Sequence, residues 1–218
     1  MKNRLILSTY GAALGLMLAG TLPATAAQPQ GEPAVDAGQA ALKPRGDIKG
    51  LSNFAKVSDA LYRGAQPTRE GFAELKKLGV KTVINLRAKH SDEKLIKDLG
   101  FNYFSIPTDT WDLDDKHAAR FLSIVLDKAN QPVFVHCQHG SDRTGTMVAV
   151  YRVYEQKWTP DAAMKELPVF GFHKIWVNLK GYLKNLDIKK VDEEMRRLRA
   201  AAPVGLRRGT TRGRTARL

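Results

Sequence analysis

The feature that most constrains the fold of this chain is a short apolar run that leads directly into a polar loop. Residues 132–136 read Pro-Val-Phe-Val-His, and Cys137 follows at once. A continuous apolar run of this length is typical of a strand buried on both faces of a parallel sheet. From Thr144 onward the pattern becomes helical. The polar residues 138–143 therefore connect a buried strand to a helix, and such connections are where α/β folds bind ligands.

The rest of the sequence alternates between β-like and helical segments. Short apolar runs are followed by stretches in which an apolar residue recurs every three or four positions. This alternation predicts an α/β fold with a central, mostly parallel sheet flanked by helices. The expected strands are 60–63, 81–86, 102–106 and 132–136, and the expected helices are 68–78, 91–99, 114–128, one from Thr144, one capped by Thr159, and 176–200.

The first 27 residues have the features of a secretory signal. Lys2 and Arg4 precede an uncharged stretch over 5–20, and the small residues at 24–27 offer a cleavage site. The alternative is an uncleaved membrane anchor, but the apolar stretch is about 16 residues long, and spanning a bilayer takes roughly 20. We therefore predict that residues 1–27 are a cleaved signal peptide and that the protein is exported to the periplasm.

The remaining chain divides into a spacer, one domain and a basic tail. Residues 28–52 are rich in Gly, Pro, Ala and Gln, which predicts a flexible spacer, and the folded domain is expected over 53–200. Much of the net charge of +13 lies at the C-terminal end, where no acidic residue interrupts the arginines. We predict a solvated, disordered tail over 201–218; binding of an anionic surface by charge is the alternative. The arginines are Arg196, Arg197, Arg199, Arg207, Arg208, Arg212, Arg214 and Arg217.

The chain has a single cysteine, Cys137, so no intramolecular disulfide can form. The plain explanation is that it is buried and acts as a small apolar side chain. Its neighbours favour chemistry instead. A loop between a strand and a helix can curl so that backbone N–H groups hold a tetrahedral dianion beside the positive helix end. Gly140 permits such a curl, and the same field stabilises a thiolate nucleophile.

The other residues of the loop complete an anion site. The planar guanidinium of Arg143 can bind two phosphate oxygens at once, which a lysine does not reproduce. The hydroxyl of Thr144 can hydrogen-bond the thiolate, and His136 can orient the loop. We therefore predict catalysis by Cys137, Arg143 and Thr144. The predicted phosphate-binding residues are Gln138, His139, Gly140, Ser141, Asp142 and Arg143.

The segment 136–144 resembles the signature of the cysteine-dependent protein tyrosine phosphatase superfamily. That signature is histidine, the catalytic cysteine, two variable residues, glycine, two variable residues, arginine, then serine or threonine, and every fixed position is matched. The similarity extends from about Asn53 to Phe172, through 61–67 and 83–87, toward small bacterial dual-specificity-type phosphatases, including exported ones. The resemblance implies a dual-specificity phosphatase-like fold, a phosphocysteine intermediate, and no metal or other cofactor.

The resemblance also implies a general acid, an aspartate from the loop before the helix that precedes the catalytic strand. Here that loop is 108–115. Asp114 and Asp115 lie next to the predicted helix and are explained as its N-cap and first-turn acids. Asp109 and Asp112 remain. We favour Asp109, because it directly follows the strand end and its distance from the catalytic cysteine is close to the family's interval.

Other polar and aromatic residues are assigned structural roles. Arg63, Gln66 and Arg87 lie at the ends of predicted strands and are expected to support turns and packing rather than to bind a ligand. Trp111 could help to wall the substrate or cover the acid, but an aromatic residue in a short loop is expected to pack against its own domain. The histidines outside the loop are scattered along the chain, which is not an arrangement of zinc ligands.

These observations predict a phosphate monoester hydrolase that acts on phosphotyrosine in proteins, and also on phosphoserine and phosphothreonine if the pocket is shallow. A phosphoinositide or inositol-phosphate phosphatase is the alternative among enzymes, although the variable loop residues add no fixed cation to meet further phosphates. A phosphate-binding module without turnover and a sulfur-transfer enzyme are further alternatives. The predicted partners are a phosphorylated protein or a phosphate ester.

Overall fold

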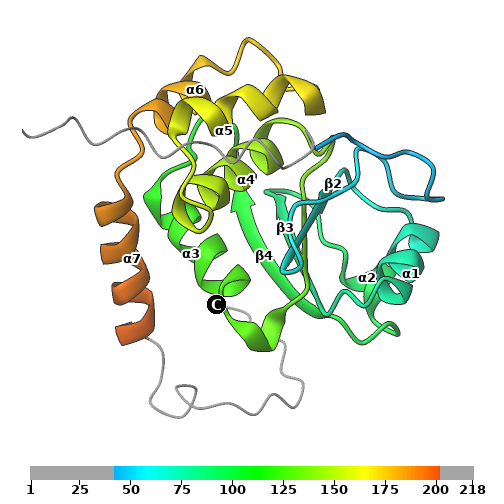
Figure 1. Ribbon diagram of the computed structural model, residues 1–218. Helices are drawn as coiled ribbons and strands as arrows, with labels where there is room; N and C mark the ends of the chain where they lie inside the picture. Colours follow the sequence, from blue (N-terminus) through cyan, green and yellow to red (C-terminus); the bar gives the residue numbers. More distant parts are fainter. Residues whose placement is uncertain (1–41, 202–218) are drawn as a thin grey trace, which may run out of the picture. The chain divides into compact units, whose positions relative to one another are not determined.

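The protein is represented by a computed structural model that describes residues 42–201. Its strands are β1 (Ala55–Lys56), β2 (Leu61–Gly64), β3 (Thr82–Arg87), β4 (Asn102–Thr108) and β5 (Val133–His136). They form one sheet in the order β1-β2-β5-β3-β4 (Figure 1). All neighbouring strands are parallel except β1 and β2. The predicted mostly parallel α/β sheet is confirmed, and β5 lies at its centre.

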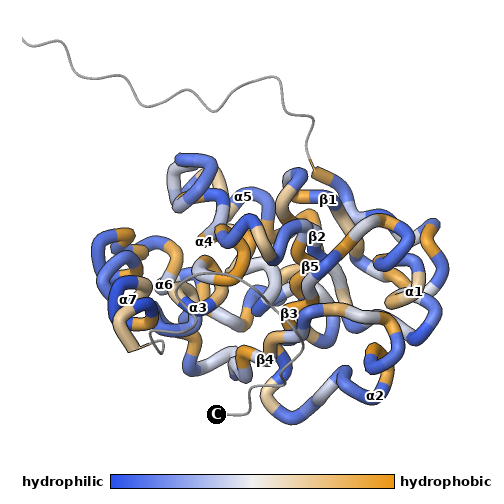
Figure 2. The backbone as a smooth tube through the Cα atoms, turned by 90° about the horizontal axis from the view of Figure 1, so that it is seen from below, coloured by the Kyte–Doolittle hydropathy of each residue, from blue (hydrophilic) through white to orange (hydrophobic). Residues whose placement is uncertain are grey.

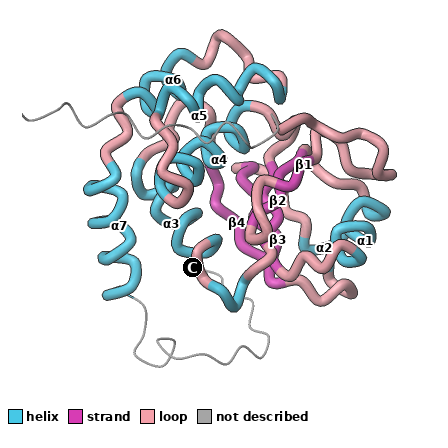
Figure 3. Tube along the Cα trace, in the orientation of Figure 1, coloured by secondary structure: helices cyan, strands magenta, loops and turns pink. Residues whose placement is uncertain are grey.

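Helices cover both faces of this sheet (Figure 3). The helices on one face are α1 (Arg69–Lys77) and α2 (Glu93–Ile96). On the other side lie α3 (Asp115–Val125), α4 (Asp142–Tyr154), α5 (Pro160–Glu166), α6 (Val177–Lys184) and α7 (Ile188–Ala201), with 3-10 turns η1 (Lys128–Asn130) and η2 (Leu167–Phe170). Figure 2 shows hydrophilic and hydrophobic residues alternating along α1 and α7, as expected of helices with one face buried and one in solvent.

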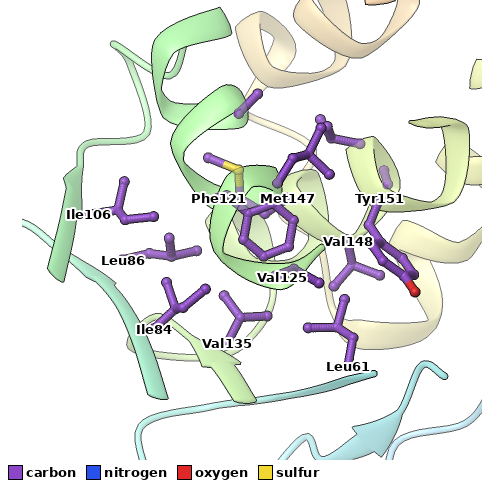
Figure 4. Close-up of a cluster of buried hydrophobic side chains, with 14 of the residues drawn as sticks. Leu61, Ile84, Leu86, Ile106, Phe121, Val125, Val135, Met147, Val148 and Tyr151 are labelled. Atoms are coloured by element: carbon purple, nitrogen blue, oxygen red, sulfur yellow. The ribbon is translucent and has the colours of Figure 1, made fainter. Parts of the chain in front are cut away.

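The strands send apolar side chains alternately to the two faces. Val135 and Ile84 join a large cluster with α3 and α4, whereas Phe134 and Val83 join a smaller cluster with α1. Successive residues of a strand point to opposite faces, so the continuous apolar run of β5 is used on both. Figure 4 shows the larger cluster, where the strand residues Leu61, Ile84, Leu86, Ile106 and Val135 lie near Phe121 and Val125 of α3 and Met147, Val148 and Tyr151 of α4.

Three elements differ from the sequence prediction. The helix expected over 91–99 is reduced to α2, because the carboxylate of Asp92 makes no cap hydrogen bond and instead contacts His136 and Gln66. The helix expected over 176–200 is divided into α6 and α7. The sequence does not predict β1, because a strand of two residues is too short to have a recognisable period.

Folded structure begins earlier than the sequence predicts. Leu51 is a core residue with 3% exposure, and Arg45 pairs with Phe54 in an antiparallel bridge. Leu42 and Ile48 also pack against the apolar clusters. The flexible spacer prediction is therefore wrong for residues 42–52, because these apolar side chains find partners on the domain.

The predicted signal peptide over 1–27, the first part of the spacer and the basic tail from residue 202 lie outside the described residues, so they stay predictions. Within residues 42–201, none of the helices combines the length and the apolar character needed to cross a bilayer.

Candidate active site

The loop after β5 lies at the centre of the carboxyl edge of the sheet. β2 and β3 flank β5 in parallel, so their following loops lie on either side. Cys137 comes directly after the strand and is 2% exposed. α4 begins at Asp142 and is 13 residues long, so the positive end of its dipole faces the loop. The predicted strand, loop and helix are all present, with the thiol at their junction.

This loop has a run of hydrogen-bond donors without partners. None of the backbone N–H groups from Gln138 to Thr144 donates a hydrogen bond within the part of the chain that the structure describes. The Nε of Arg143 and the Oγ1 of Thr144 are buried and also lack a partner there. Buried polar groups are rarely left unpaired. A bound oxyanion would satisfy this set, as in an anion nest at a helix start.

Gly140 allows the loop to press against the end of β2. Its φ is 71°, in the left-handed region that side-chain-bearing residues avoid. A Cβ at this position would lie 2.5 Å from the carbonyl carbon of Gly64 and 2.6 Å from the nitrogen of Ala65. Both reasons require glycine, which supports the role predicted for Gly140 in the curl.

Arg63 fixes the loop at Gly140 by a hydrogen bond. Its Nη2 donates to the carbonyl oxygen of Gly140 at 2.7 Å, and its guanidinium stacks 3.6 Å from the ring centre of Phe170. Burial lowers the pKa of Arg63 to about 10, while Glu166 and Cys137 act in the opposite direction. The guanidinium therefore remains charged at neutral pH and adds positive potential near the thiol.

Two amides hold the loop from the side. Asn53 Nδ2 donates to the carbonyl oxygens of His139 at 2.9 Å and Phe170 at 3.0 Å. The backbone N–H of Gln66 donates to the carbonyl oxygen of Gln138 at 3.2 Å. The bonds to His139 and Gln138 use loop carbonyl groups, so they fix the loop and leave its N–H groups free for an anion.

A buried hydrogen bond between a histidine and a carboxylate supports the start of the loop. His136 Nε2 lies 2.9 Å from the Asp92 carboxylate, both side chains are fully buried, and the other ring nitrogen lies 3.2 Å from the carbonyl oxygen of Cys137. Burial raises the pKa of Asp92, but its interactions with His136 and Gln66 outweigh burial and hold the pKa below the ordinary value. The orienting role predicted for His136 thus has a structural basis, and the sequence does not reveal Asp92 as its partner.

The acid-bearing loop separates the four candidate aspartates. Asp114 caps α3 by accepting from the N–H groups of Lys116 and His117, and Asp115 accepts from the Tyr182 hydroxyl. Both therefore have the structural explanation that the sequence predicts. Among the other two, the carboxylate of Asp112 turns back onto the backbone N–H of Asp109 at 3.0 Å.

Asp109 instead lines a hollow of about 340 Å³ next to the catalytic loop. The hollow brings together predicted residues from both loops, and Arg143 reaches the strand before the acid loop by donating from Nη1 to the Thr108 carbonyl oxygen at 3.2 Å. Cys137, Gly140, Ser141 and Thr144 are buried and do not form its wall. The lining residues are Asp109, Thr110, Trp111, Gln138, His139, Asp142, Arg143, His173, Ile175 and Trp176.

For the outer wall of this hollow, the sequence suggests only Trp111, and only as an alternative to packing. Trp111 is 71% exposed, so the prediction that it packs against its own domain is wrong. Ile175 is 74% exposed and faces the same hollow. The only sequence signal for Ile175 and Trp176 is their apolar character, which is also typical of ordinary packing.

Asp142 ties this wall to the loop. Its carboxylate accepts from the backbone N–H of His173 and lies 2.8 Å from Nδ1 of the same residue. The side chain of Asp142 is therefore engaged by His173, and only its backbone N–H remains for a phosphate. His173 gains a positioning role that its isolated place in the sequence does not suggest.

Within residues 42–201, no cluster of three or more His, Cys, Asp or Glu side chains is arranged to hold a metal ion. The anion site is built from backbone N–H groups and arginine.

A central strand that ends at a buried cysteine, a curled loop with free donors and an arginine at the helix start define the class of cysteine-dependent phosphatases. The sequence model of the family described as "DSP-PTPase phosphatase fused to NAD+ Kinase" matches residues 47–175, and the chain belongs to this family.

Curated relatives with two kinds of names are similar to this chain. The dual specificity protein phosphatase TpbA of Pseudomonas aeruginosa is 36% identical over 124 residues, which are 55% of each protein, so the match spans about half the length of that relative. The inositol diphosphatase DSP2 of Oryza sativa is 28% identical over 151 residues, which are 66% of this chain and 70% of the rice protein.

Solved structures have the same fold. The crystal structure of P. aeruginosa TpbA in complex with pTyr superposes with a TM-score of 0.62 at 28% identity, over 72% of this chain and 96% of that one. The core catalytic domain of the PP-IP phosphatase SIW14 from S. cerevisiae gives a TM-score of 0.61 over 71% of this chain and 98% of that one. Its identity of 22% supports the likeness of fold alone.

Proposed function

We propose that this chain is a phosphate monoester hydrolase of the protein tyrosine or dual-specificity type, and that it acts through a phosphocysteine intermediate. The observation that carries the proposal is the set of unpaired donors around Cys137. The N–H groups of Gln138 to Thr144 and the Nε of Arg143 are free to receive a phosphoryl group over the sulfur.

In the first step the Cys137 thiolate attacks phosphorus. A sulfur–phosphorus bond forms, and the bond from phosphorus to the ester oxygen breaks. The protonated carboxyl of Asp109 gives its proton to the departing oxygen. The loop N–H groups and Arg143 stabilise the negative charge on the equatorial phosphoryl oxygens during the transfer. The product is an alcohol or a phenol, and the phosphoryl group stays on the enzyme.

In the second step a water molecule attacks the phosphocysteine. The Asp109 carboxylate takes a proton from this water, the sulfur–phosphorus bond breaks, and inorganic phosphate leaves. The hydroxyl of Thr144 has no partner within the described residues and is free to donate to the departing thiolate. The enzyme returns to its starting protonation state, so the two steps balance.

The aromatic outer wall favours an aryl ester. Trp111, Ile175 and Trp176 line the hollow beside the loop, and a phenyl ring of a substrate would lie against them. TpbA is a similar protein whose structure holds pTyr, which supports phosphotyrosine as a substrate here. TpbA is named a dual specificity protein phosphatase, which supports phosphoserine and phosphothreonine as further substrates in the proposal.

The test is hydrolysis of p-nitrophenyl phosphate by the purified protein and by the variant Cys137→Ser. We expect turnover by the wild type, none by the variant, and retained binding of inorganic phosphate in calorimetry, because the loop donors remain. Phosphate binding without turnover in the wild type would instead establish a binding module. Full activity of Cys137→Ser would rule out the proposed nucleophile.

An inositol-phosphate phosphatase is the second candidate. A second hollow next to the catalytic loop favours this candidate. The variable residues of the catalytic loop carry no fixed cation, but Arg87 and Lys89, at the end of β3 and just after it, line this hollow and could bind further phosphates. The rice relative named inositol diphosphatase also supports this candidate. A screen of phosphopeptides and inositol phosphates with one protein preparation separates the two candidates by their kcat/KM values.

A further inference from the structure

The second hollow has a volume of about 230 Å³ and adjoins the hollow that Trp111 and Trp176 line. Asp109, Gln138 and Arg143 line both hollows, so a ligand held at the catalytic loop can extend into either. The two hollows differ in chemistry, since the first is bounded by tryptophan and isoleucine and the second by basic side chains. The remaining lining residues of the second hollow are Arg87, Ala88 and Lys89.

No ion pair neutralises the cations of the second hollow, although the side chain of Asp109 also lines it. None of Arg87, Lys89 and Arg143 forms an ion pair with a carboxylate among residues 42–201. The two buried arginines of the domain, Arg63 and Arg152, are by contrast both paired with Glu166, at 3.7 Å and 2.9 Å. Like charges gathered in one hollow repel one another, so they are retained at a cost that a bound anion would relieve.

Arg87 is held in place before any ligand binds. Its backbone N–H donates to Asn85 Oδ1 at 2.8 Å, and its Nη1 donates to Gln66 Oε1 at 3.1 Å. Gln66 is fixed in turn by donating from Nε2 to the Asp92 carboxylate at 2.6 Å. These bonds use one of the five guanidinium N–H groups and leave the others for a ligand. Such preorganisation lowers the entropy lost on binding.

We propose that Arg87 and Lys89 form a second anion subsite, which binds a phosphoryl group adjacent to the one held over Cys137. The inference rests on the proposed function, because it extends the substrate of the same site. The substrate class is a compact molecule that carries two phosphoryl groups close together. Phosphate fits this pair better than a carboxylate, because it offers three acceptor oxygens and up to two negative charges.

With this subsite, a substrate held by Arg143 can make its further contacts in either of the two hollows. An aryl ester with one phosphate contacts the aromatic wall, and a polyphosphorylated molecule contacts Arg87 and Lys89. The segment after β3 therefore decides how far the site accepts a second phosphate, whereas the catalytic loop itself is common to both kinds of substrate.

The test compares inhibition of p-nitrophenyl phosphate hydrolysis by inorganic pyrophosphate and by inorganic orthophosphate. Pyrophosphate reaches both sites and orthophosphate only one. We expect the wild type to bind pyrophosphate more tightly than orthophosphate. Lys89→Met should reduce this preference by about tenfold, because a charged hydrogen-bond donor is removed. Arg87→Met should act in the same direction. Lys81→Met, an exposed lysine at the opposite end of β3, is the matched control and should leave the preference unchanged.

The source of the second phosphate is identified by two substrates, inositol hexakisphosphate and a peptide with two neighbouring phosphotyrosines. We expect Lys89→Met to lower kcat/KM for the inositol phosphate more than for the peptide, since only a compact molecule places both phosphates within the two hollows. A larger loss on the peptide would overturn the compact substrate. Equal inhibition by pyrophosphate and orthophosphate in the wild type, or an unaltered preference in Lys89→Met, would overturn the subsite. Failure of the wild type to hydrolyse p-nitrophenyl phosphate would instead overturn the proposed function.

Discussion

The two loops that form the site differ in how firmly they are held. The catalytic loop after β5 is largely buried, with only Gln138 and His139 exposed, and it receives hydrogen bonds from Asn53, Arg63 and Gln66. The loop between β4 and α3 contains the exposed Trp111. Asn178 donates to the carbonyl oxygen of Thr110, but the other hydrogen bonds of residues 109–114 are local, such as the one that the Asp109 N–H donates to Asp112. One loop is preorganised and the other is open to solvent.

This difference assigns separate tasks to the two loops. A nucleophile and an oxyanion site act best when they do not reorganise during the reaction, and such a site needs support from packed neighbours. Selection of a substrate and delivery of a proton tolerate a less constrained segment. We therefore expect changes in the open loop to depend on the substrate, and changes in the buried loop to affect every substrate equally.

The largest substrate-dependent effect is expected at Asp109. Asp109→Asn should lower kcat/KM for phenyl phosphate by about 10²- to 10⁴-fold, the usual contribution of a positioned general acid. The loss should be much smaller for p-nitrophenyl phosphate, whose leaving group needs little protonation. Asp112→Asn is the matched control in the same loop and should retain most activity. The assignment of the acid is wrong if the two variants behave in the opposite way.

In the buried loop, Arg143→Lys should lower kcat/KM by about 10²- to 10³-fold, comparable to the loss of one oxyanion donor. A lysine keeps the charge but cannot offer the two parallel N–H groups of a guanidinium. The loss should be the same for phenyl and p-nitrophenyl phosphate. A ratio that changes between these two substrates would remove the distinction between the loops.

The support beneath the loop is tested with Asp92→Asn. At neutral pH we expect a loss of about 1.5–3 kcal/mol in the free energy of unfolding, since a hydrogen bond to a charged group is removed. The pKa of Asp92 is held below its ordinary value of 3.8, so its stabilising contribution is present above that pH and is lost as the pH falls through the lowered pKa. Urea denaturation should thus show the variant and the wild type converging at low pH. A difference that stays constant between pH 7 and pH 3 would contradict this account.

The smallest effect is expected at the outer wall. Trp111→Ala should raise KM for an aryl phosphate by about threefold to tenfold, because an aromatic contact contributes little more than this. Hydrolysis of glycerol phosphate should hardly change. Val177→Ala is a suitable control, because Val177 is exposed to 72% and does not line the hollow.

The central part of the fold and the catalytic loop were predictable, because each follows from the pattern of residues close together in the sequence. The apolar run before Cys137 specifies a buried strand, and the glycine, arginine and threonine that follow have roles that depend on spacing along the chain. The capping roles of Asp114 and Asp115 are local for the same reason, and the structure confirms the cap at Asp114.

Features that depend on distant contacts were not predictable. Asp92 lies near the start of a predicted helix, but its carboxylate contacts the buried His136 instead of capping the helix, and the helix is shorter than predicted. Residues 42–52 have no apolar period, and only the surface of the folded domain gives Leu51 a place to be buried. The second hollow was likewise not predictable, because it forms only where the end of β3 lies next to the catalytic loop in the folded domain.

A covalent phosphoryl group on Cys137 is the most direct consequence of the proposed mechanism. The decisive measurement is to mix the enzyme with excess p-nitrophenyl phosphate, quench the reaction in acid during turnover, and locate the modification by peptide mass spectrometry. We predict a phosphoryl group on Cys137 and on no other residue, which accumulates further in Asp109→Asn because activation of the attacking water is slowed. Turnover without this adduct, or a phosphoryl group on His139 instead, would contradict the account.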